Sequence, residues 1–260
     1  MSRAADFQAL KATVAALETA GGPDRAVLPL GDPRLDGVFP AGGLPLGCWH
    51  EVAGEGLEIE TGTVAGAFAA VLAKPLASRG VLVWVMRRDD LHAPGLAGLG
   101  FPADQMIQVQ ARDEAQVLAA LEDALGAGGV AAAIGEIGNV DLTAGRRLQL
   151  ACEKRGATGF LIRRRPFGAS TRAPAIGMGS AATTRWSVAS APSAPTPGMI
   201  GLGAPRWRAD LTRCRGGRPG SWILEMNDGP YPLSVVAQLG DRQLATPQPG
   251  RVIDNWRRAG

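Results

Sequence analysis

The sequence predicts an α/β protein with a mostly parallel sheet and antiparallel strands toward its C-terminal end. Between residues 81 and 162, strand-like runs alternate with helical stretches at a spacing typical of βαβ units. The runs at 81–86 and 130–134 are continuously apolar, as in strands buried on both faces of a parallel sheet. After residue 162 the pattern changes, and short alternating segments joined by tight turns indicate antiparallel pairing.

Composition places the chain among globular proteins. It has 260 residues, of which 46% are hydrophobic and 20% charged, enough for the core of one large α/β domain. The longest apolar runs fall short of the roughly 20 residues of a membrane span, and the start lacks a secretory signal pattern. Three scattered cysteines and two histidines argue against a zinc site or a disulfide scaffold. We therefore expect a cytoplasmic protein with no membrane contact and no metal.

Charge is distributed unevenly along the chain. Residues 1–160 hold 13 basic and 19 acidic residues, a net charge of −6, whereas residues 161–260 hold 14 arginines and 5 acidic residues, a net charge of +9. Such asymmetry predicts contact with nucleic acid or with an acidic partner. The alternative is a GC-rich genome, which would explain arginine over lysine but not why the acidic residues stay in the first part.

The individual elements follow from periodicity, caps and turn residues. We expect a segment punctuated by proline and glycine at 26–47, a strand at 48–53, a helix at 63–78 that Pro75 kinks or shortens, a short helix at 95–99, a strand at 106–109, helices at 113–125 and 141–155, and strands at 158–162, 183–190 and 232–238. Residues 206–214 and 221–226 predict a hairpin around a turn at 215–220. His50 is expected to be hydrogen-bonded within its strand rather than catalytic, and Cys152 to pack on the inner face of its helix.

Two terminal segments stand apart from this pattern. Phe7 and Leu10 lie on the apolar face of a predicted amphipathic helix within residues 1–22, which Gly21-Gly22-Pro23 ends. The helix either docks on a partner or packs on its own domain. Trp256 beside Arg257 and Arg258, in a polar tail at 241–260, is a candidate partner contact because tryptophan and arginine are enriched at binding hot spots. The alternative is a tail that docks on its own sheet.

The segment between the first long strand and the following helix stands where a phosphate loop would be. Such a loop needs Gly-x-x-x-x-Gly-Lys-Ser/Thr, because backbone N–H groups cradle the phosphates and the lysine neutralises them. The chain offers Gly54, Glu55, Glu60, Thr61, Gly62 and Thr63. The lysine is missing and the glutamates would repel a triphosphate. The sequence therefore predicts a degenerate phosphate loop and no nucleotide cofactor.

The order of these parts over residues 26–190 resembles the core of the RecA recombinase family. The string Arg-Cys-Arg-Gly-Gly-Arg-Pro-Gly-Ser-Trp at 213–222 resembles more specifically the ImuA family, RecA-like accessory proteins of bacterial SOS mutagenesis. The resemblance implies a RecA-like P-loop-NTPase-type domain at 26–240. Its parts would be a core at 26–190, a flexible linker at 191–203 and an antiparallel hairpin extension at 204–240.

The resemblance also locates the positions of ATPase chemistry. The Walker-B aspartate that would hold magnesium is replaced by Gly135-Glu136. The water-activating glutamate position falls near Arg88-Asp89-Asp90, where two arginines intrude. We therefore expect no ATPase activity.

The basic loop after residue 162 corresponds to the RecA loop that contacts single-stranded DNA. Its arginines would neutralise phosphates and its phenylalanine would stack on a base. The nucleic-acid-binding candidates are Arg163, Arg164, Arg165, Phe167 and Arg172. The alternatives are a solvated basic loop or a patch for an acidic protein.

The function implied by the resemblance is that of a non-catalytic adaptor in damage-inducible SOS translesion DNA synthesis and mutagenesis. It would bind an inactive Y-family polymerase homologue and, indirectly, an error-prone replicative-type polymerase; RecA and single-stranded DNA are further candidates. One alternative is a SulA-like inhibitor of the division protein FtsZ, since SulA is also RecA-like without a working phosphate loop. A second is a RecA-type DNA-dependent ATPase.

Overall fold

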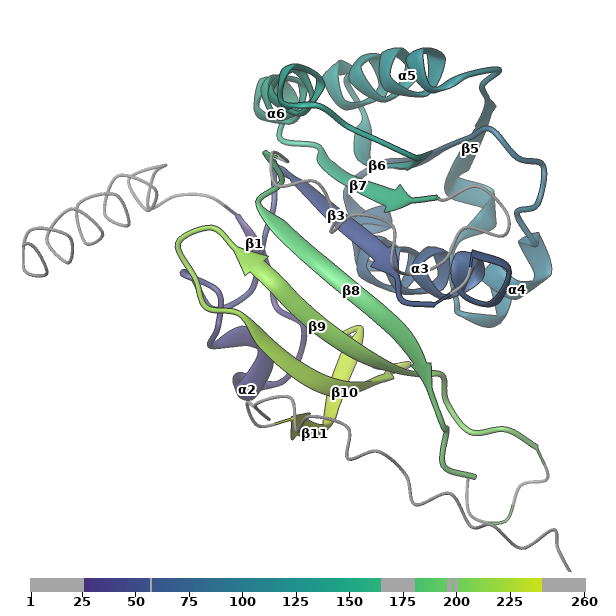
Figure 1. The fold of residues 1–260 in the computed structure, drawn as a ribbon, viewed down its shortest axis with the longest axis vertical. Helices are drawn as coiled ribbons and strands as arrows, with labels where there is room; N and C mark the ends of the chain where they lie inside the picture. The colour runs from purple at the N-terminus through teal and green to yellow at the C-terminus, as the bar shows by residue number, and fades with distance from the viewer. Residues whose placement is uncertain (1–25, 57, 165–180, 196–197, 199–200, 240–260) are drawn as a thin grey trace, which may run out of the picture.

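A nine-stranded sheet runs through the whole molecule. The structure, a computed structural model, describes residues 26–56, 58–164, 181–195, 198 and 201–239. The sheet order is β11-β10-β9-β8-β3-β7-β6-β4-β5 (Figure 1). The strands are β3 (Trp49–Gly54), β4 (Val81–Met86), β5 (Met106–Gln110), β6 (Val130–Ile137), β7 (Thr158–Arg163), β8 (Thr184–Ala191), β9 (Arg206–Cys214), β10 (Gly220–Met226) and β11 (Leu233–Leu239). The six strands from β8 to β5 in this order are parallel, and β9, β10 and β11 continue the sheet in antiparallel pairing.

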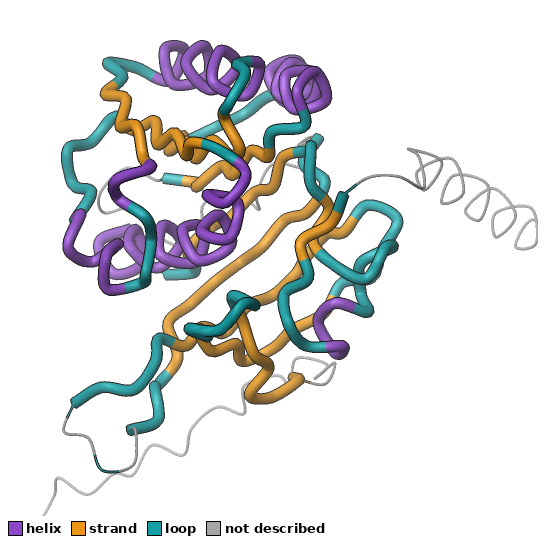
Figure 2. The backbone as a smooth tube through the Cα atoms, turned by 180° about the vertical axis from the view of Figure 1, so that it is seen from behind, coloured by secondary structure: helices purple, strands orange, loops and turns teal. Residues whose placement is uncertain are grey.

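Helices cover both faces of the parallel part (Figure 2). One face carries α5 (Glu114–Gly126) and α6 (Leu142–Arg155), and the other carries α3 (Glu58–Ala73), which continues into the 3₁₀ helix η1 (Lys74–Arg79). The short helices α4 (Ala93–Gly98) and η2 (Ala103–Gln105) connect β4 to β5. None of the described helices is long and apolar enough to cross a membrane.

The first described segment packs beside the last strand of the sheet. Strands β1 (Val27–Leu28) and β2 (Leu44–Pro45) form a small antiparallel ladder around α2 (Pro33–Asp36). The N–H of Leu233 donates to the Leu30 carbonyl at 3.2 Å, and Arg34 Nη2 donates to the Val235 carbonyl at 2.7 Å. The beginning and the end of the described chain are therefore joined directly.

One apolar core runs under both the parallel and the antiparallel strands. Phe68 of α3 lies 5.5 Å from the ring of Trp186 on β8 and 5.7 Å from that of Trp207 on β9. Trp186 in turn lies 6.4 Å from Trp222 on β10. A second core on the opposite face packs Trp49 with α5 and α6. The antiparallel extension thus belongs to the same folding unit as the RecA-like core.

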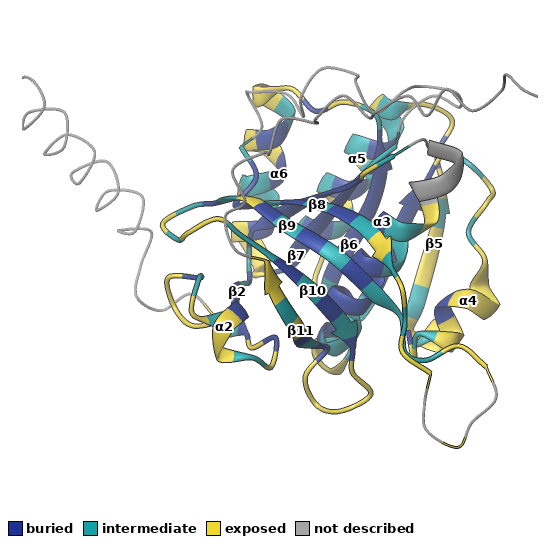
Figure 3. Cartoon of the chain, turned by 60° about the horizontal axis from the view of Figure 1, so that its bottom comes forward, coloured by how far each residue is buried: buried dark blue, intermediate teal, exposed yellow. Residues whose placement is uncertain are grey.

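The antiparallel strands bury one face only (Figure 3). On β9, Trp207, Ala209 and Leu211 point into the core, while Arg206 and Arg208 alternate with them on the other face. No described helix covers that second face, which is seen directly in Figure 1. This alternation follows from the two-residue period of a strand with one solvated side.

Most predicted boundaries are confirmed, and the exceptions have local causes. Asp141 caps α6 by accepting from the Ala144 N–H at 2.7 Å, and Gly156 ends it with φ +76°. Pro75 shortens the α-helix, one of the two predicted outcomes: α3 ends at Ala73 and the chain continues as the 3₁₀ helix η1, because proline removes an α-helical N–H donor. The expected start of that helix at residue 63 is wrong, since α3 begins at Glu58. The predicted N-terminal helix (1–22), part of the linker and the tail (241–260) lie outside the described residues.

Candidate functional site at the carboxyl edge of the sheet

The carboxyl ends of parallel strands form the edge where open α/β sheets bind their ligands. Here charged residues stand at or just beyond the ends of five strands. They are Glu55 after β3, Arg87, Arg88 and Asp90 after β4, Arg112 after β5, Glu136 near the end of β6, and Arg163 and Arg164 at the end of β7. Their mutual contacts decide what this edge can bind.

The degenerate phosphate loop is mostly helix. Strand β3 ends at Gly54 and α3 begins at Glu58, so only residues 55–57 connect them. Glu60, Thr61, Gly62 and Thr63 are therefore inside α3. A glutamate in the first turn is favoured by the helix dipole, and no lysine is there to favour a phosphate instead. Glu55 lies outside the helix and forms an ion pair with Arg208 of β9.

Glu136 occupies the Walker-B position and is held by the protein itself. The indole N–H of Trp84 donates to Glu136 Oε1 at 2.9 Å, and Arg164 Nη1 lies 3.3 Å from Oε2. Arg164 also donates to Asp90 Oδ2 at 2.6 Å. Burial raises the pKa of Glu136, against the opposing effects of the Trp84 hydrogen bond and the Arg164 charge. One guanidinium thus bridges two carboxylates at the place where magnesium would bind in an ATPase.

A second buried carboxylate links the three central strands. Glu51 on β3 is 1% exposed and lies 3.6 Å from Arg163 Nε on β7 and 3.5 Å from Arg185 Nε on β8. Arg163 also donates to the Asn139 side chain at 3.3 Å. Charges buried this deeply are tolerated when opposite charges and hydrogen bonds surround them.

His50, the neighbour of Glu51, is fully enclosed in the sheet. Its Nε2 lies 3.0 Å from the Pro45 carbonyl, which only accepts, so Nε2 carries the proton and Nδ1 accepts from the Thr184 hydroxyl at 2.8 Å. Burial lowers the pKa of His50 to about 4, opposed by the Pro45 hydrogen bond. The prediction of a structural, hydrogen-bonded histidine is confirmed.

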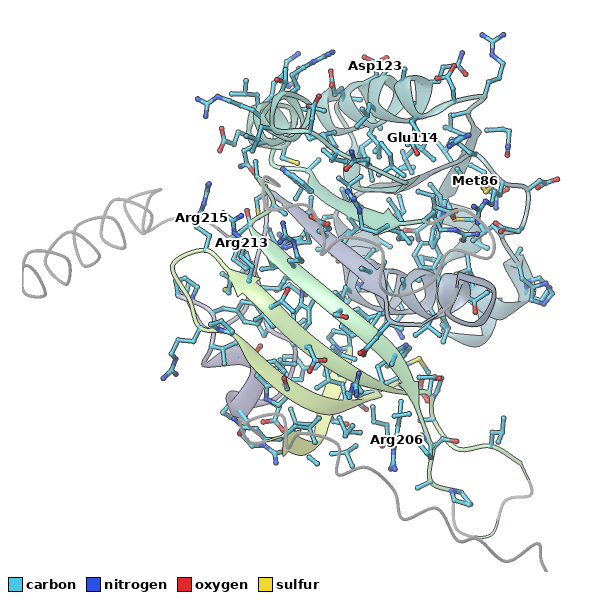
Figure 4. All side chains as sticks on the ribbon, viewed as in Figure 1. Met86, Glu114, Asp123, Arg206, Arg213 and Arg215 are labelled. Atoms are coloured by element: carbon cyan, nitrogen blue, oxygen red, sulfur yellow. The ribbon has the colours of Figure 1, made fainter. Side chains whose placement is uncertain are left out.

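Two hollows open at this edge, one on each side of β4 and β6. A mainly apolar groove of about 510 Å³ is lined by α3, by α4, by the end of β8 with the residues that follow it, and by the start of β9 with the residues that precede it. A smaller pocket of about 340 Å³ lies on the α5 side and is lined by charged residues. Figure 4 shows Glu114 at the start of α5 near the end of β4, which Met86 marks. Among the described residues, no group of three or more His, Cys, Asp or Glu is placed to hold a metal ion.

The sequence of this chain was compared with those of known proteins. Protein ImuA of Caulobacter vibrioides (strain NA1000 / CB15N) is 57% identical over 231 residues, covering 86% of this chain and 95% of that protein. The chain belongs to the ImuA family. The same protein from a second Caulobacter vibrioides strain, ATCC 19089, matches equally. No protein-family model matches the sequence.

Solved structures support the fold of this ImuA-family chain. A KaiC-like protein from the archaeon Pyrococcus horikoshii OT3 superposes with a TM-score of 0.50 at 16% identity, covering 82% of this chain and all of the other. At that identity the likeness concerns the fold alone. The predicted RecA-like α/β fold, with a mostly parallel sheet and antiparallel C-terminal strands, is confirmed.

The structure places only part of the predicted binding residues. Arg163 and Arg164 have side chains 13% exposed, and both lie against carboxylates rather than extending from a loop. Arg165, Phe167 and Arg172 lie outside the described residues, as do Phe7, Leu10, Trp256, Arg257 and Arg258. The DNA and partner contacts of this ImuA-family chain therefore stay predictions.

Sequence reasoning missed several cations of the site. Arg112 follows a strand with weak alternation, and Arg206 and Arg208 stand on the open face of β9. Figure 4 shows Arg206 at one end of β9 and Arg213 near the other. The available signal was their position at strand ends and at every second residue, which places them on one edge and on one face.

Proposed function

We propose that this chain is a non-catalytic, RecA-like adaptor in damage-inducible SOS translesion DNA synthesis and mutagenesis. Membership of the ImuA family supports the process. The observation that carries the non-catalytic role is the position of Glu136, whose two oxygens face Trp84 and Arg164 within the protein. A carboxylate held in this way is poorly suited to coordinate the magnesium that phosphoryl transfer requires.

The phosphate-binding segment supports the same conclusion. Its connection of three residues carries no lysine, and the first lysine downstream is Lys74, at the far end of α3. At about 1.5 Å per residue, Lys74 lies roughly 24 Å along the helix from Glu58. Its ammonium donates instead to the Leu99 carbonyl at 3.2 Å. We therefore expect no ATP hydrolysis above background, with or without single-stranded DNA, in a phosphate-release assay.

The proposed partners are an inactive Y-family polymerase homologue, an error-prone replicative-type polymerase indirectly, RecA and single-stranded DNA. The candidate protein contacts are Phe7 and Leu10 near one end and Trp256, Arg257 and Arg258 near the other. The candidate DNA contacts are Arg163, Arg164, Arg165, Phe167 and Arg172. The net charge of +9 over residues 161–260 supports a polyanionic or acidic partner for that part of the chain.

A deletion series tests the adaptor function. Residues 204–239 form three strands of the sheet, so a tail deletion must begin at residue 240 to leave the fold intact. We expect the full chain to capture the polymerase homologue in a pulldown, the chain lacking 240–260 to lose most of that capture, and Trp256→Ala to lose part of it. Deletion of 1–22 tests Phe7 and Leu10 in the same assay. Capture unaffected by both deletions would overturn these contact assignments.

Cellular assays separate the adaptor from its alternatives. Loss of the chain should lower damage-induced mutation, and its overproduction should leave cell length unchanged. Filamentous cells on overproduction with normal induced mutation would favour a SulA-like inhibitor of FtsZ instead. ATP turnover stimulated by single-stranded DNA would favour the RecA-type ATPase.

A further inference from the structure

A basic pocket lies on the α5 side of the carboxyl edge. It has a volume of about 340 Å³, and its described lining contains four arginines and two glutamates. Arg87 and Arg88 follow β4, Arg112 follows β5, and Arg164 follows β7, while Glu114, Glu136 and Gly138 complete the wall. None of these residues comes from the connection between β3 and α3. The pocket shares Glu136 and Arg164 with the Walker-B position, but the connection where a phosphate loop would lie does not line it.

The two carboxylates of the lining are engaged in the wall of the pocket. Glu114 Oε1 accepts from the Gly138 N–H at 2.9 Å and lies 3.4 Å from Arg87 Nη1. Glu136 accepts from the indole N–H of Trp84 and faces Arg164. The lining carries two formal positive charges in excess, and one if Asp90, which pairs with Arg164 from outside the lining, is included. A partly enclosed pocket with net positive charge attracts anions.

Backbone geometry fixes this wall in place. A Cβ at Gly138 would lie 2.5 Å from Glu114 Oε1, so a larger residue there would shift the Glu114 carboxylate from its present position. The start of α5 is held in place as well, since the N–H of Arg112 donates to the Gln116 side chain at 2.9 Å and Asp113 caps the helix. The arginines therefore project from positioned backbone, which lowers the cost of ordering them around a ligand.

We propose that this pocket binds phosphate groups. Guanidinium groups present planar forks of N–H donors that match phosphate oxygens, and several of them converging on one pocket suit a group with three or more oxygens. The described lining contains no aromatic side chain on which a base could stack, so the phosphates rather than a base are recognised. The volume lies at the lower end of the about 300–1,000 Å³ of small-ligand sites and exceeds what one small ion fills. The phosphates belong either to a free polyphosphate compound or to a nucleic-acid strand.

Calorimetric titration of the full chain with inorganic pyrophosphate at low salt tests the proposal. We expect saturable binding that weakens about tenfold in Arg88→Gln and in Arg112→Gln, because each loses charge-assisted hydrogen bonds. Arg79→Gln is the matched control, since Arg79 ends η1 at the opposite edge of the sheet and should bind as the original chain does. Arg112 is exposed, so Arg112→Gln is expected to unfold at the same temperature as the original chain. This variant therefore tests the pocket even if Arg88→Gln is destabilised.

Competition distinguishes the two sources of phosphate. A single-stranded oligothymidylate that displaces pyrophosphate, and whose own binding falls in Arg112→Gln, assigns the pocket to a DNA backbone; this arm rests on the DNA contact proposed above. Pyrophosphate binding that the oligonucleotide leaves unchanged assigns it to free phosphate compounds. Absence of pyrophosphate binding, or equal losses in Arg79→Gln and Arg112→Gln, would overturn the pocket. Because polymerase-homologue capture is read separately, that failure is distinguishable from failure of the adaptor function.

Discussion

Single residues at the carboxyl edge show how this chain departs from a nucleotide-binding protein. Three carboxylates, Glu51, Glu136 and Asp90, face arginines of β7 and β8, where an ATPase would leave carboxylate and lysine for magnesium and phosphate. Removing one partner of such a buried pair leaves the other charge uncompensated, which is costly. These carboxylates are therefore paired with arginines of the protein itself.

His50 should make stability depend on pH in mildly acidic solution. Its pKa is about 4 in the folded chain against an ordinary value of 6.5, so between these values the unfolded chain binds more protons. The free energy of unfolding should fall as pH drops from 6.5 to 4, by on the order of 3 kcal/mol from this residue. Urea unfolding of the original chain and of His50→Gln at pH 7.5 and pH 4 measures it. A stability difference between the two chains that is the same at both pH values would contradict the assignment.

The three cysteine thiols should be unreactive in the folded protein. Cys48, Cys152 and Cys214 are all buried, and burial raises the pKa of the Cys214 thiol to about 11. Since the thiolate is the reactive form, we expect almost no reaction with a thiol reagent at pH 8 and three equivalents after unfolding. Rapid reaction of one thiol in the native chain would show that its element opens locally.

At the scale of elements, short local signals in the sequence mark the starts of α5 and α6 and the end of α6. No such signal marks the start of α3 at Glu58. Asp113 and Asp141 each accept a hydrogen bond from the third residue after them, as N-caps do. Gly156 ends α6 in the left-handed region, where side chains with a Cβ are strained. The start of α3 follows Gly56-Leu57 in the sequence, which offers no side chain of the kind that caps helices.

Two glycines of similar exposure should respond oppositely to alanine. No atom lies within 4 Å of a Cβ added at Gly156 or at Gly128, but only Gly156 has positive φ, at +76°. Gly156→Ala should lower the free energy of unfolding by about 1 kcal/mol. Gly128→Ala should leave it unchanged or raise it by up to about 1 kcal/mol, because the unfolded chain loses freedom. Thermal unfolding of both variants, read by circular dichroism, compares them; equal losses would contradict the role assigned to the positive φ of Gly156.

At the scale of the molecule, the antiparallel extension completes the RecA-like core. Trp186 on β8 is fully buried, and its ring lies near those of Phe68 on α3 and Trp222 of the extension. Without β9 to β11, the inner face of β8 would be exposed to water together with an unpaired strand edge. The extension is thus required for stability as well as being available for contacts.

Truncation should separate these roles. A chain ending at residue 239 keeps all nine strands and should unfold in one cooperative step. A chain ending at residue 203 loses β9, β10 and β11 and should be insoluble or lack a cooperative transition, because the buried tryptophans lose their cover. Size-exclusion chromatography and thermal unfolding compare the two. A stable, monomeric 1–203 chain would make the extension an accessory domain.

The sequence predicted the class of the fold well because its signals are local. The apolar run of β4, the caps of α6 and the turn between β9 and β10 each determine their own element. The site was harder to predict, because it depends on which strand ends meet. Arg164 and Glu136 are far apart in sequence, and only the β6–β7 pairing brings them together. Glu60, Thr61, Gly62 and Thr63 were predicted to lie in a loop, whereas the structure places them within α3.

The contact between α2 and β11 also bears on how the protein emerges from the ribosome. Arg34 and Val235, which that contact joins, are separated by 201 residues. At about 5–20 residues per second, translation reaches β11 roughly 10–40 s after α2. During that interval the segment that contains α2 has no β11 to contact. The apolar face of β8 likewise stays uncovered until β9 has been synthesised. The nascent chain therefore depends on shielding until its last strand has been made, and slowing translation late in the message would lengthen that exposure.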